Sequence, residues 1–334
     1  MKGVPQTAGG LSPAGGLSAK AGLSPSGGLS PAGGLSPAGD PSARQDRVLT
    51  ALMALSMCVW GGSWVSAKLI AAMAASEVIV FWRFFLTTVS FVPILLAFRQ
   101  SLRLRPSSMV KAALGAALVV GYNQCFFVGL RMGLAGVGGV LSPSLCTIFT
   151  FGMAAILTRR LPRGAQVLGL VLGLAGSLVL IRIWTVSGRE LYRSGNLFFI
   201  LGALSWAGVT LVSQRAQQEV PFLAYSFVVY ALSCLLELAL ALPRGLFAIH
   251  GPALVFWGNL AYLSFLANSF AMTVYILASS RLGGGRASAF MLVIPVSALV
   301  LSWLVLGERP TLPTLTGAGL LILAVYLINK KGKT

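Results

Sequence analysis

The sequence contains few charged residues and very few acidic ones. Only 10% of its 334 residues are charged, whereas an ordinary soluble domain has about 25%. Just 7 Asp and Glu residues stand against 25 Lys and Arg residues. Hydrophobic residues make up 56% of the chain, and the mean hydropathy is +0.85. Because one water-soluble globule could not enclose so much apolar surface, the composition predicts an integral membrane protein.

Histidine and cysteine are also scarce, and their positions argue against catalysis. The single histidine, His250, lies in a predicted loop, and the 4 cysteines form neither a Cys-x-x-Cys pair nor a Cys/His cluster. A metal enzyme and a Ser-His-Asp hydrolase are therefore poorly supported. We expect no catalytic residue, no metal site and no cofactor.

The net charge of +18 could indicate nucleic-acid binding. However, the aromatic residues lie in apolar runs and not beside clusters of Lys and Arg. We therefore interpret the charge as the basic excess of cytoplasmic loops in a polytopic protein, and we expect no nucleic-acid partner.

Residues 1–43 form a low-complexity segment, in which Gly-Leu-Ser recurs with a period of six. Its Gly, Ser, Pro and Ala residues cannot bury enough apolar surface to offset the entropy of ordering, so we predict a disordered tail. It lacks the apolar core of a signal peptide. Residues 329–334 are predicted to form a basic cytoplasmic tail.

Ten apolar segments with short connections lie between these tails, and they predict an all-α polytopic membrane protein with ten transmembrane helices. The predicted segments are Val48–Met73, Glu77–Phe98, Ser108–Leu130, Gly136–Leu157, Ala165–Trp184, Gly195–Gln214, Pro221–Leu242, Leu254–Ser280, Ala287–Leu306 and Thr311–Ile328.

The distribution of basic residues predicts the orientation. With the N-terminus inside, 17 Lys and Arg residues fall on the cytoplasmic side and 7 on the opposite side and its margins. This bias predicts a multi-pass protein with both termini in the cytoplasm, which requires an even number of spans.

The chain is organised around the apolar run from Ala287 to Pro310, which contains Pro295. A similar run with Pro143 lies about 149 residues earlier, and Trp60 recurs as Trp206 at an offset of 146. A proline within a helix frees a carbonyl that needs a partner or a wet cavity, so both prolines are predicted helix breaks.

These recurrences predict two five-helix repeats, over residues 48–184 and 195–328. Because five crossings is an odd number, the second repeat must cross the membrane in the opposite direction. Inverted repeats are typical of secondary transporters, whose substrates bind near the midplane between the repeats.

Three stretches resemble EamA-type members of the drug/metabolite transporter superfamily. They are WGGSWVSAK from Trp60 to Lys68, FWRF from Phe81 to Phe84, and IPVSALVLSWLVLGERP from Ile294 to Pro310. The resemblance implies a ten-helix inverted-repeat transporter, generally an exporter or importer of small metabolites in the inner membrane. One departure is Thr158-Arg159-Arg160, where the first half of such proteins often ends its fourth span with Gly-Glu-Arg.

Two basic residues are candidates for contacting an anionic substrate, because charges within spans are costly and hint at function. Lys68 ends the first predicted span, and Arg83 lies early in the second. The alternative is that Lys68 extends to the interface and that Arg83 pairs with Glu77 or helix-end carbonyls.

Polar and aromatic residues in equivalent spans of the two halves are further candidates for binding an amino acid or related solute. Either they line a cavity, or their amides hold helices together. With the two basic residues above, the candidate substrate-binding set is Trp60, Lys68, Arg83, Tyr122, Asn123, Trp206, Asn268, Ser269 and Tyr275, beside Gln124 and Thr273.

Two acidic residues remain open to more than one interpretation. Glu237, within the seventh span, could carry a proton or could face a loop near Arg244, and Glu308 fits a helix-end contact better than a coupling site. A membrane-embedded enzyme using Glu237, Glu308 or His250 and a non-transporting sensor are the alternative functions.

Gly169 and Gly173 form a Gly-x-x-x-Gly pair that allows close helix packing. We expect an internal contact there, and a homodimer is the alternative. The sequence has no nucleotide-binding motif, so a proton or solute gradient is the expected energy source. Export is the expected direction.

Overall fold

A computed structural model shows that the described part of the chain is helical, without a β-strand among its residues. The structure describes residues 41–99, 102, 104–159, 164–185, 187–275 and 290–329. The low-complexity repeats, the triglycine at 283–285 and the basic tail therefore lie outside the described residues.

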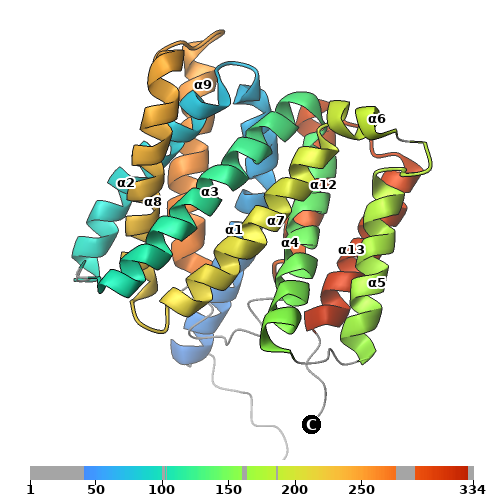
Figure 1. Ribbon diagram of the computed structural model, residues 1–334, viewed down its shortest axis with the longest axis horizontal. Helices are drawn as coiled ribbons and strands as arrows, with labels where there is room; N and C mark the ends of the chain where they lie inside the picture. The colour runs from blue at the N-terminus through green and yellow to red at the C-terminus, as the bar shows by residue number, and fades with distance from the viewer. Residues whose placement is uncertain are drawn as a thin grey trace, which may run out of the picture. The chain divides into compact units, whose positions relative to one another are not determined.

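Each predicted apolar segment coincides with a helix in the described ranges (Figure 1). The first five are α1 (Pro41–Ala71), α2 (Ser76–Ala97), α3 (Pro106–Met132), α4 (Ala135–Thr158) and α5 (Gly164–Leu180). The later ones are α7 (Asn196–Ala216), α8 (Phe222–Ala241), α9 (Ala253–Ala261) with its π-helical continuation η2 (Tyr262–Ala271), α12 (Val293–Leu306) and α13 (Leu312–Asn329). The short helix α6 (Gly188–Arg193) lies in a predicted connection, and η1 (Leu242–Arg244) begins at the last residue of the predicted segment Pro221–Leu242.

Seven of the described helices are long and apolar enough to cross a membrane. Three more apolar helices, Gly164–Leu180, Val293–Leu306 and Leu312–Ile328, are shorter. Large apolar side chains such as Leu96, Ile156 and Leu254 are more than 70% exposed on their surfaces. An outward-facing apolar surface of this kind fits a lipid environment and would be unfavourable in water.

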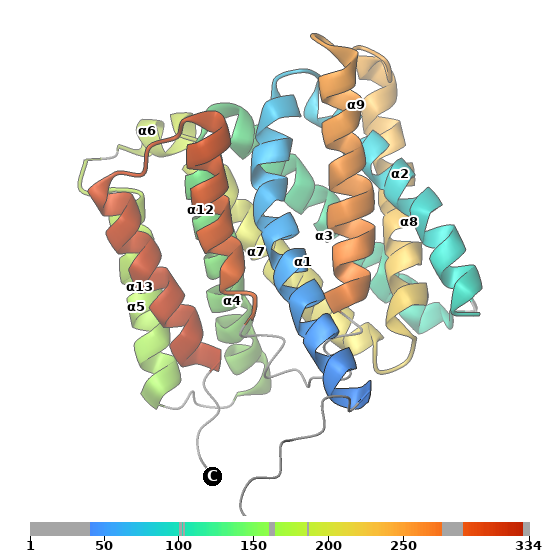
Figure 2. The same ribbon diagram turned by 180° about the vertical axis from the view of Figure 1, so that it is seen from behind.

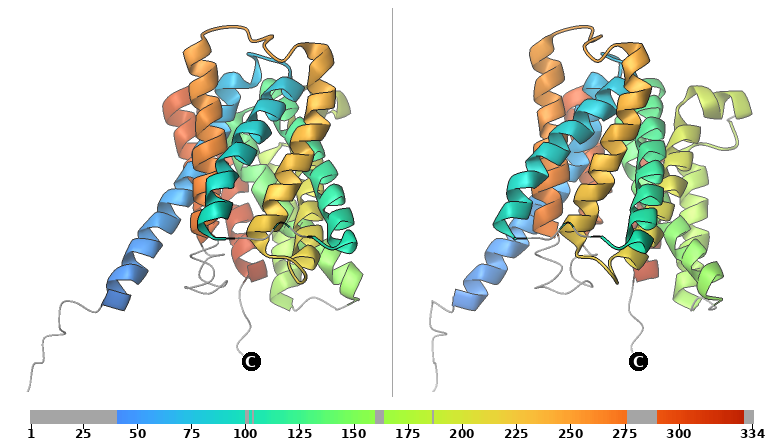
Figure 3. Two further views of the ribbon diagram at one scale, coloured as in Figure 1. Left: turned by 90° about the vertical axis from the view of Figure 1, so that its left-hand side faces the viewer. Right: turned by 60° about the vertical axis from the view of Figure 1, so that its left-hand side comes forward.

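The helices pack in reciprocal pairs. Three interfaces each have a counterpart between helices of the same rank in the other half. The α3–α7 interface corresponds to η2–α1, α4–α7 corresponds to α12–α1, and α3–α8 corresponds to η2–α2. The remaining major pairs, α2 with α8, α4 with α12 and α5 with α13, join helices of equal rank in the two halves. Figure 1 and Figure 2 show α5 and α13 side by side, and Figure 3 shows α2 (cyan) between η2 (orange) and α8 (gold).

The start of α1 and the end of α13 lie on the same side of the helical bundle (Figure 2). The ends of α1, α3 and α8 and the start of α2 lie on the opposite side, together with α6. The chain therefore crosses the helical bundle an even number of times from the start of α1 to the end of α13.

The two prolines occupy different positions in their helices. Pro143 lies inside α4, which continues over it, and the Thr147 hydroxyl donates to the Pro143 carbonyl at 3.2 Å. Pro295 is the third residue of α12, which begins directly after a turn at Met291 and Leu292. A proline is tolerated in the first turn of a helix because the N–H groups there have no intrahelical acceptor.

Small residues bring α5 and α13 into close contact. A Cβ built on Gly169 would lie 2.9 Å from the Ala324 carbonyl oxygen, and one built on Gly176 would lie 3.1 Å from that of Gly317. The expected internal contact of the Gly-x-x-x-Gly pair is thus confirmed, and α13 is its partner.

Candidate functional site

Arg83 is a buried arginine at the junction of α2, α3 and η2. One guanidinium nitrogen donates to Asn123 Oδ1 at 2.9 Å, and another donates to Asn268 Oδ1 at 3.0 Å. Its Nε is buried and has no hydrogen-bond partner among the described residues. Among the described residues, the positively charged guanidinium of Arg83 is therefore held by two amide oxygens and has no carboxylate as a counter-charge.

The orientation of both amides is set by their nitrogen atoms. Asn123 Nδ2 donates to the Val119 carbonyl at 2.9 Å, and Asn268 Nδ2 donates to Thr87 Oγ1 at 3.2 Å. Each amide oxygen is thereby turned toward Arg83. The Ser264 hydroxyl also donates to the Arg83 carbonyl at 3.2 Å, which ties η2 to α2 at the same level.

The segment that supplies Asn268 is a π-helix, Tyr262–Ala271. In this register the Ser269 hydroxyl donates to the Ser264 carbonyl at 3.0 Å, and its oxygen lies 2.5 Å from Ser90 Oγ on α2. The Trp60 indole nitrogen donates to the Ala267 carbonyl at 2.8 Å. Wide helical turns are rare and often occur at functional sites, because they redirect side chains such as Asn268.

The aromatic candidates form two pairs, one on each repeat-related interface. Tyr122 on α3 lies 4.6 Å from Trp206 on α7, measured between ring centroids, and Trp60 on α1 lies 5.6 Å from Tyr275, which follows η2. α1 is thus paired with the η2 region through Trp60, just as α7 is paired with α3 through Trp206. The correspondence of the two tryptophans in the sequence is therefore matched in space.

Phe126 connects the charged and aromatic groups and was not predicted from the sequence. Its ring lies 5.8 Å from Arg83 Cζ, 5.8 Å from the Tyr122 ring and 4.7 Å from the Trp64 ring. A cation above an aromatic face is a favourable contact in a dry site. Thr87 and Ser264, also missed, lie four residues after Arg83 and four before Asn268, a spacing that places them on the same helical faces.

Lys68 has other partners. Its ammonium donates to the carbonyls of Leu130 and Gly133 at 2.5 and 2.6 Å, at the end of α3. The Glu308 carboxylate accepts hydrogen bonds from the N–H groups of Ala135 and Gly136 at 2.9 and 2.8 Å, at the start of α4. The predicted helix-end contact of Glu308 is confirmed, and Lys68 acts on the neighbouring helix end.

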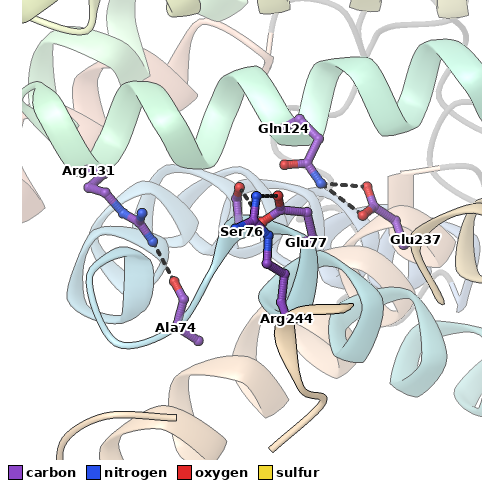
Figure 4. Close-up of polar contacts among 7 residues, drawn as sticks. All are labelled: Ala74, Ser76, Glu77, Gln124, Arg131, Glu237 and Arg244. Carbon is purple, nitrogen blue, oxygen red and sulfur yellow. Dashed lines mark hydrogen bonds and ion pairs between the residues drawn. The ribbon is translucent and has the colours of Figure 1, made fainter. Parts of the chain in front are cut away.

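Glu237 on α8 is fully buried and is held by Gln124 of α3 (Figure 4). The Gln124 amide nitrogen lies 3.0 and 2.8 Å from the two carboxyl oxygens. Arg244, the loop partner considered for Glu237, instead pairs with Glu77 at 3.5 Å. Figure 4 also shows Arg131 donating to the Ala74 carbonyl, at 2.5 Å.

A surface groove of about 390 Å³ lies between α1, the α9–η2 segment and α12. Gly62, Ser66, Asn259 and Tyr262 line it together with Val and Leu side chains. None of the candidate substrate-binding residues lines this groove. The amide and aromatic candidates instead gather around Arg83, between α2, α3 and η2, or at the adjoining α1–η2 and α3–α7 interfaces.

Comparisons with known proteins agree with this architecture. Residues 49–182 and 193–330 match the EamA-like transporter family, one match in each half. A probable amino-acid metabolite efflux pump of Salmonella typhimurium is 27% identical over 67% of this chain and 78% of its own. A protein of the same description in Escherichia coli is 23% identical over 85% and 95%.

The uncharacterized transporter YyaM of Bacillus subtilis is 26% identical over 73% of this chain and 81% of its own. One solved crystal structure aligns over 84% of this chain and 97% of its own, with a TM-score of 0.59 and 16% identity, which is a similarity of fold.

The apolar helices and the duplicated match define a multi-pass membrane transporter. The chain belongs to the EamA-like transporter family. The resemblance of the Trp60, Phe81 and Ile294 stretches to EamA-type proteins is confirmed.

Proposed function

We propose that this protein is a secondary transporter that moves a small, carboxylate-bearing metabolite, an amino acid or a related solute, out of the cell across the inner membrane. Both termini would lie in the cytoplasm, with ten helices crossing the membrane. The relatives described as amino-acid metabolite efflux pumps support the substrate class and the direction.

Two inverted five-helix repeats are supported by the reciprocal packing of the helices. The helices α1 to α5 can be exchanged in order with α7, α8, α9–η2, α12 and α13. Each of the major interfaces named above then becomes another observed interface or stays the same. A twofold relation in the membrane plane allows one half to rock against the other around a central site, which is alternating access.

The observation that carries the substrate assignment is Arg83. A buried guanidinium without a carboxylate partner among the described residues carries a large desolvation cost that a substrate carboxylate would offset. Its planar fork can also bind a carboxylate in two contacts. The two amides orient the guanidinium without neutralising it, so the positive charge stays available to an anionic ligand.

The enzyme interpretation receives less support, because the acidic residues Glu77, Glu237 and Glu308 are each held by a polar partner of their own. Glu237 contacts Gln124, Glu308 binds the start of α4, and Glu77 pairs with Arg244. An acid–base pair would require two such groups directed at a substrate and not at neighbouring side chains.

The test is uptake of radiolabelled amino acids into proteoliposomes. We expect Arg83→Gln to lower uptake about 30-fold or more, because losing one partner of a buried charged contact costs about 2–5 kcal/mol. Arg215→Gln, at an exposed arginine of α7, should leave uptake unchanged.

The carboxylate requirement is tested by competition. Unlabelled amino acids should inhibit uptake, and the corresponding amino-acid amides, which lack the carboxylate, should not. Equal inhibition by the amides would contradict the role of Arg83, and absence of flux for every amino acid would contradict the substrate class.

A further inference from the structure

A second buried ionisable group lies apart from Arg83, on α8. Glu237 has a relative exposure of 0%. It shares its helix face with Val229, Ser233 and Ala241, which are buried at a spacing of four residues and point toward the helices that α8 packs against. The residue lies within the candidate span Phe222–Arg244, four residues before α8 ends at Ala241, and the surrounding protein shields it from water.

The hydrogen-bond partner of this carboxyl is an amide. Gln124 approaches both carboxyl oxygens with one nitrogen, and no Lys or Arg of the described ranges forms an ion pair with Glu237. A buried carboxylate without a cation is costly, and the cost disappears when the group takes up a proton.

The ionisable groups around Glu237 do not supply a counter-charge. From α2, Glu77 faces it, and the nearby Arg244 of η1 pairs with Glu77. On α8 itself, Cys234 is the adjacent thiol, and Tyr230 lies two turns away, where its ring contacts Phe84 and Phe91 of α2.

The other charged groups of the packed helices point elsewhere. Arg83 of α2 is directed at Asn123 and Asn268. On α3, Lys111 binds Glu219 at one end of the helix, and Arg131 binds the Ala71 and Ala74 carbonyls at the other.

A primary amide can satisfy both forms of a carboxyl group. With the carboxylate, the Gln124 nitrogen donates to the oxygens, as observed. With the neutral acid, the carboxyl O–H donates to Gln124 Oε1 while the amide nitrogen donates to the other carboxyl oxygen, which gives two parallel hydrogen bonds. Neither form leaves a buried polar atom unpaired, so the pair tolerates gain and loss of a proton.

We propose that Glu237 is the proton-binding site of this transporter, with Gln124 as its partner in both protonation states. In the release step the carboxyl O–H bond breaks and the proton passes to water beyond the end of α8, in η1, where Arg244 is exposed. The location of the proton-binding site is inferred from the Glu237–Gln124 geometry. Its role in transport rests on the proposed function.

The helix α3 links this site to the arginine. Asn123 contacts Arg83, and its neighbour Gln124 contacts Glu237. A shift of α3 that accompanies ligand binding at Arg83 would therefore move the partner of Glu237. The proton and the substrate would then both bias the position of α3. Two ligands that bias the same conformational equilibrium change each other's affinity, so their binding is coupled.

The location is tested without any substrate by infrared difference spectroscopy of the full-length protein in lipid as the pH is changed. We expect a carbonyl band of a protonated carboxylic acid that appears and disappears with pH. One component of this band should be present in the native protein and in Glu190→Gln, which removes an exposed acid of α6, and missing in Glu237→Gln; the acids common to the three proteins contribute equally to all of them. Identical bands in the native protein and in Glu237→Gln would overturn the proposal, and circular dichroism would verify that the variant is folded.

The coupling is tested by radiolabelled amino-acid uptake into vesicles whose interior is more acidic by one pH unit. For exchange of one proton per substrate, this gradient would support about tenfold accumulation. Glu237→Gln should reduce the accumulation ratio to about one while exchange of labelled for unlabelled substrate continues.

The outcomes separate the two proposals. Gradient-driven accumulation that survives in Glu237→Gln would overturn the proton role while leaving transport intact. Absence of amino-acid flux in the native protein would count against the proposed substrate class, and the infrared band would still decide whether Glu237 binds a proton.

Discussion

Lys68 and Glu308 bind opposite sides of the turn that joins α3 to α4. Lys68 donates to the carbonyls that end α3, and Glu308 accepts the N–H groups that begin α4. Each side chain neutralises the partial charge of the helix end that it meets, negative at the C-terminus and positive at the N-terminus. A turn within a membrane protein is thereby supplied with partners for its free backbone groups.

Removing either side chain should lower stability. Glu308→Ala leaves two N–H groups without acceptors and should cost about 1–2 kcal/mol, as the loss of a helix cap does. Lys68→Met should cost about as much, because two carbonyls lose a charged donor. Thermal unfolding in detergent measures both. A Lys68→Met protein with native stability but impaired uptake would instead indicate that Lys68 contacts substrate.

A carboxylate placed beside Arg83 should compete with the substrate. In Asn123→Asp the guanidinium acquires a permanent internal counter-charge. We expect uptake of amino acids to fall at least about tenfold, the effect of 1.4 kcal/mol, and further than in Asn123→Ala, while the unfolding midpoint stays at or above that of Asn123→Ala. The reverse order of the two variants in uptake would argue against an anionic ligand at Arg83.

The hydrogen bond between Trp60 and the π-helix should contribute measurably to stability. Trp60→Phe removes the donor to the Ala267 carbonyl and should cost about 1 kcal/mol in thermal unfolding. Trp206→Phe loses the same volume at the related position, where the indole contacts Tyr122 through its ring. The Trp206 variant should therefore be the more stable of the two, and equal losses would mean that packing alone accounts for the effect.

Two glycines on α13 provide a matched test of helix packing. A Cβ on Gly317 would lie 2.6 to 2.8 Å from Leu180 and the Gly176 carbonyl oxygen, whereas one on Gly319 meets no atom within 4 Å. Gly317→Ala should cost about 1–3 kcal/mol through overpacking, and Gly319→Ala should change stability by about 0.5 kcal/mol or less. Similar losses in both variants would contradict the described contact between α5 and α13.

The surface pair of Lys111 and Glu219 should produce an acid-sensitive contribution to stability. The Lys111 ammonium, followed by the Ser108 hydroxyl, lowers the pKa of Glu219 from 4.5 to about 2. Because the pKa is lower in the folded protein, the contribution is present above about pH 4.5 and is lost as the pH falls toward 2.

The measurement is the difference in unfolding midpoint between the native protein and Glu219→Gln as a function of pH. It should be small at neutral pH, since the pair is exposed, shrink in about 1 M salt, and vanish near pH 2. With only 7 acidic residues in the chain, few other groups titrate in this window. Glu190→Gln is the control, and a constant difference across the window would contradict the assignment.

The sequence by itself determined the membrane class and the positions of the helices. Long apolar runs interrupted by short polar connections have no other favourable environment, so their order and approximate bounds follow from composition. The Trp60 and Trp206 correspondence falls on α1 and α7, which are the first long helices of the two family matches. The short helix α6 was missed because its six residues carry too weak a pattern.

The tertiary structure decided which polar side chains meet. Lys68 and Arg83 were equivalent candidates in the sequence, yet one serves a backbone turn and the other is held by two amides from α3 and η2. The adjacent residues Asn123 and Gln124 point to different partners on different helices. Periodicity reports only which side of a helix is buried, and the contact of one helix with another depends on crossing geometry that a single segment does not encode.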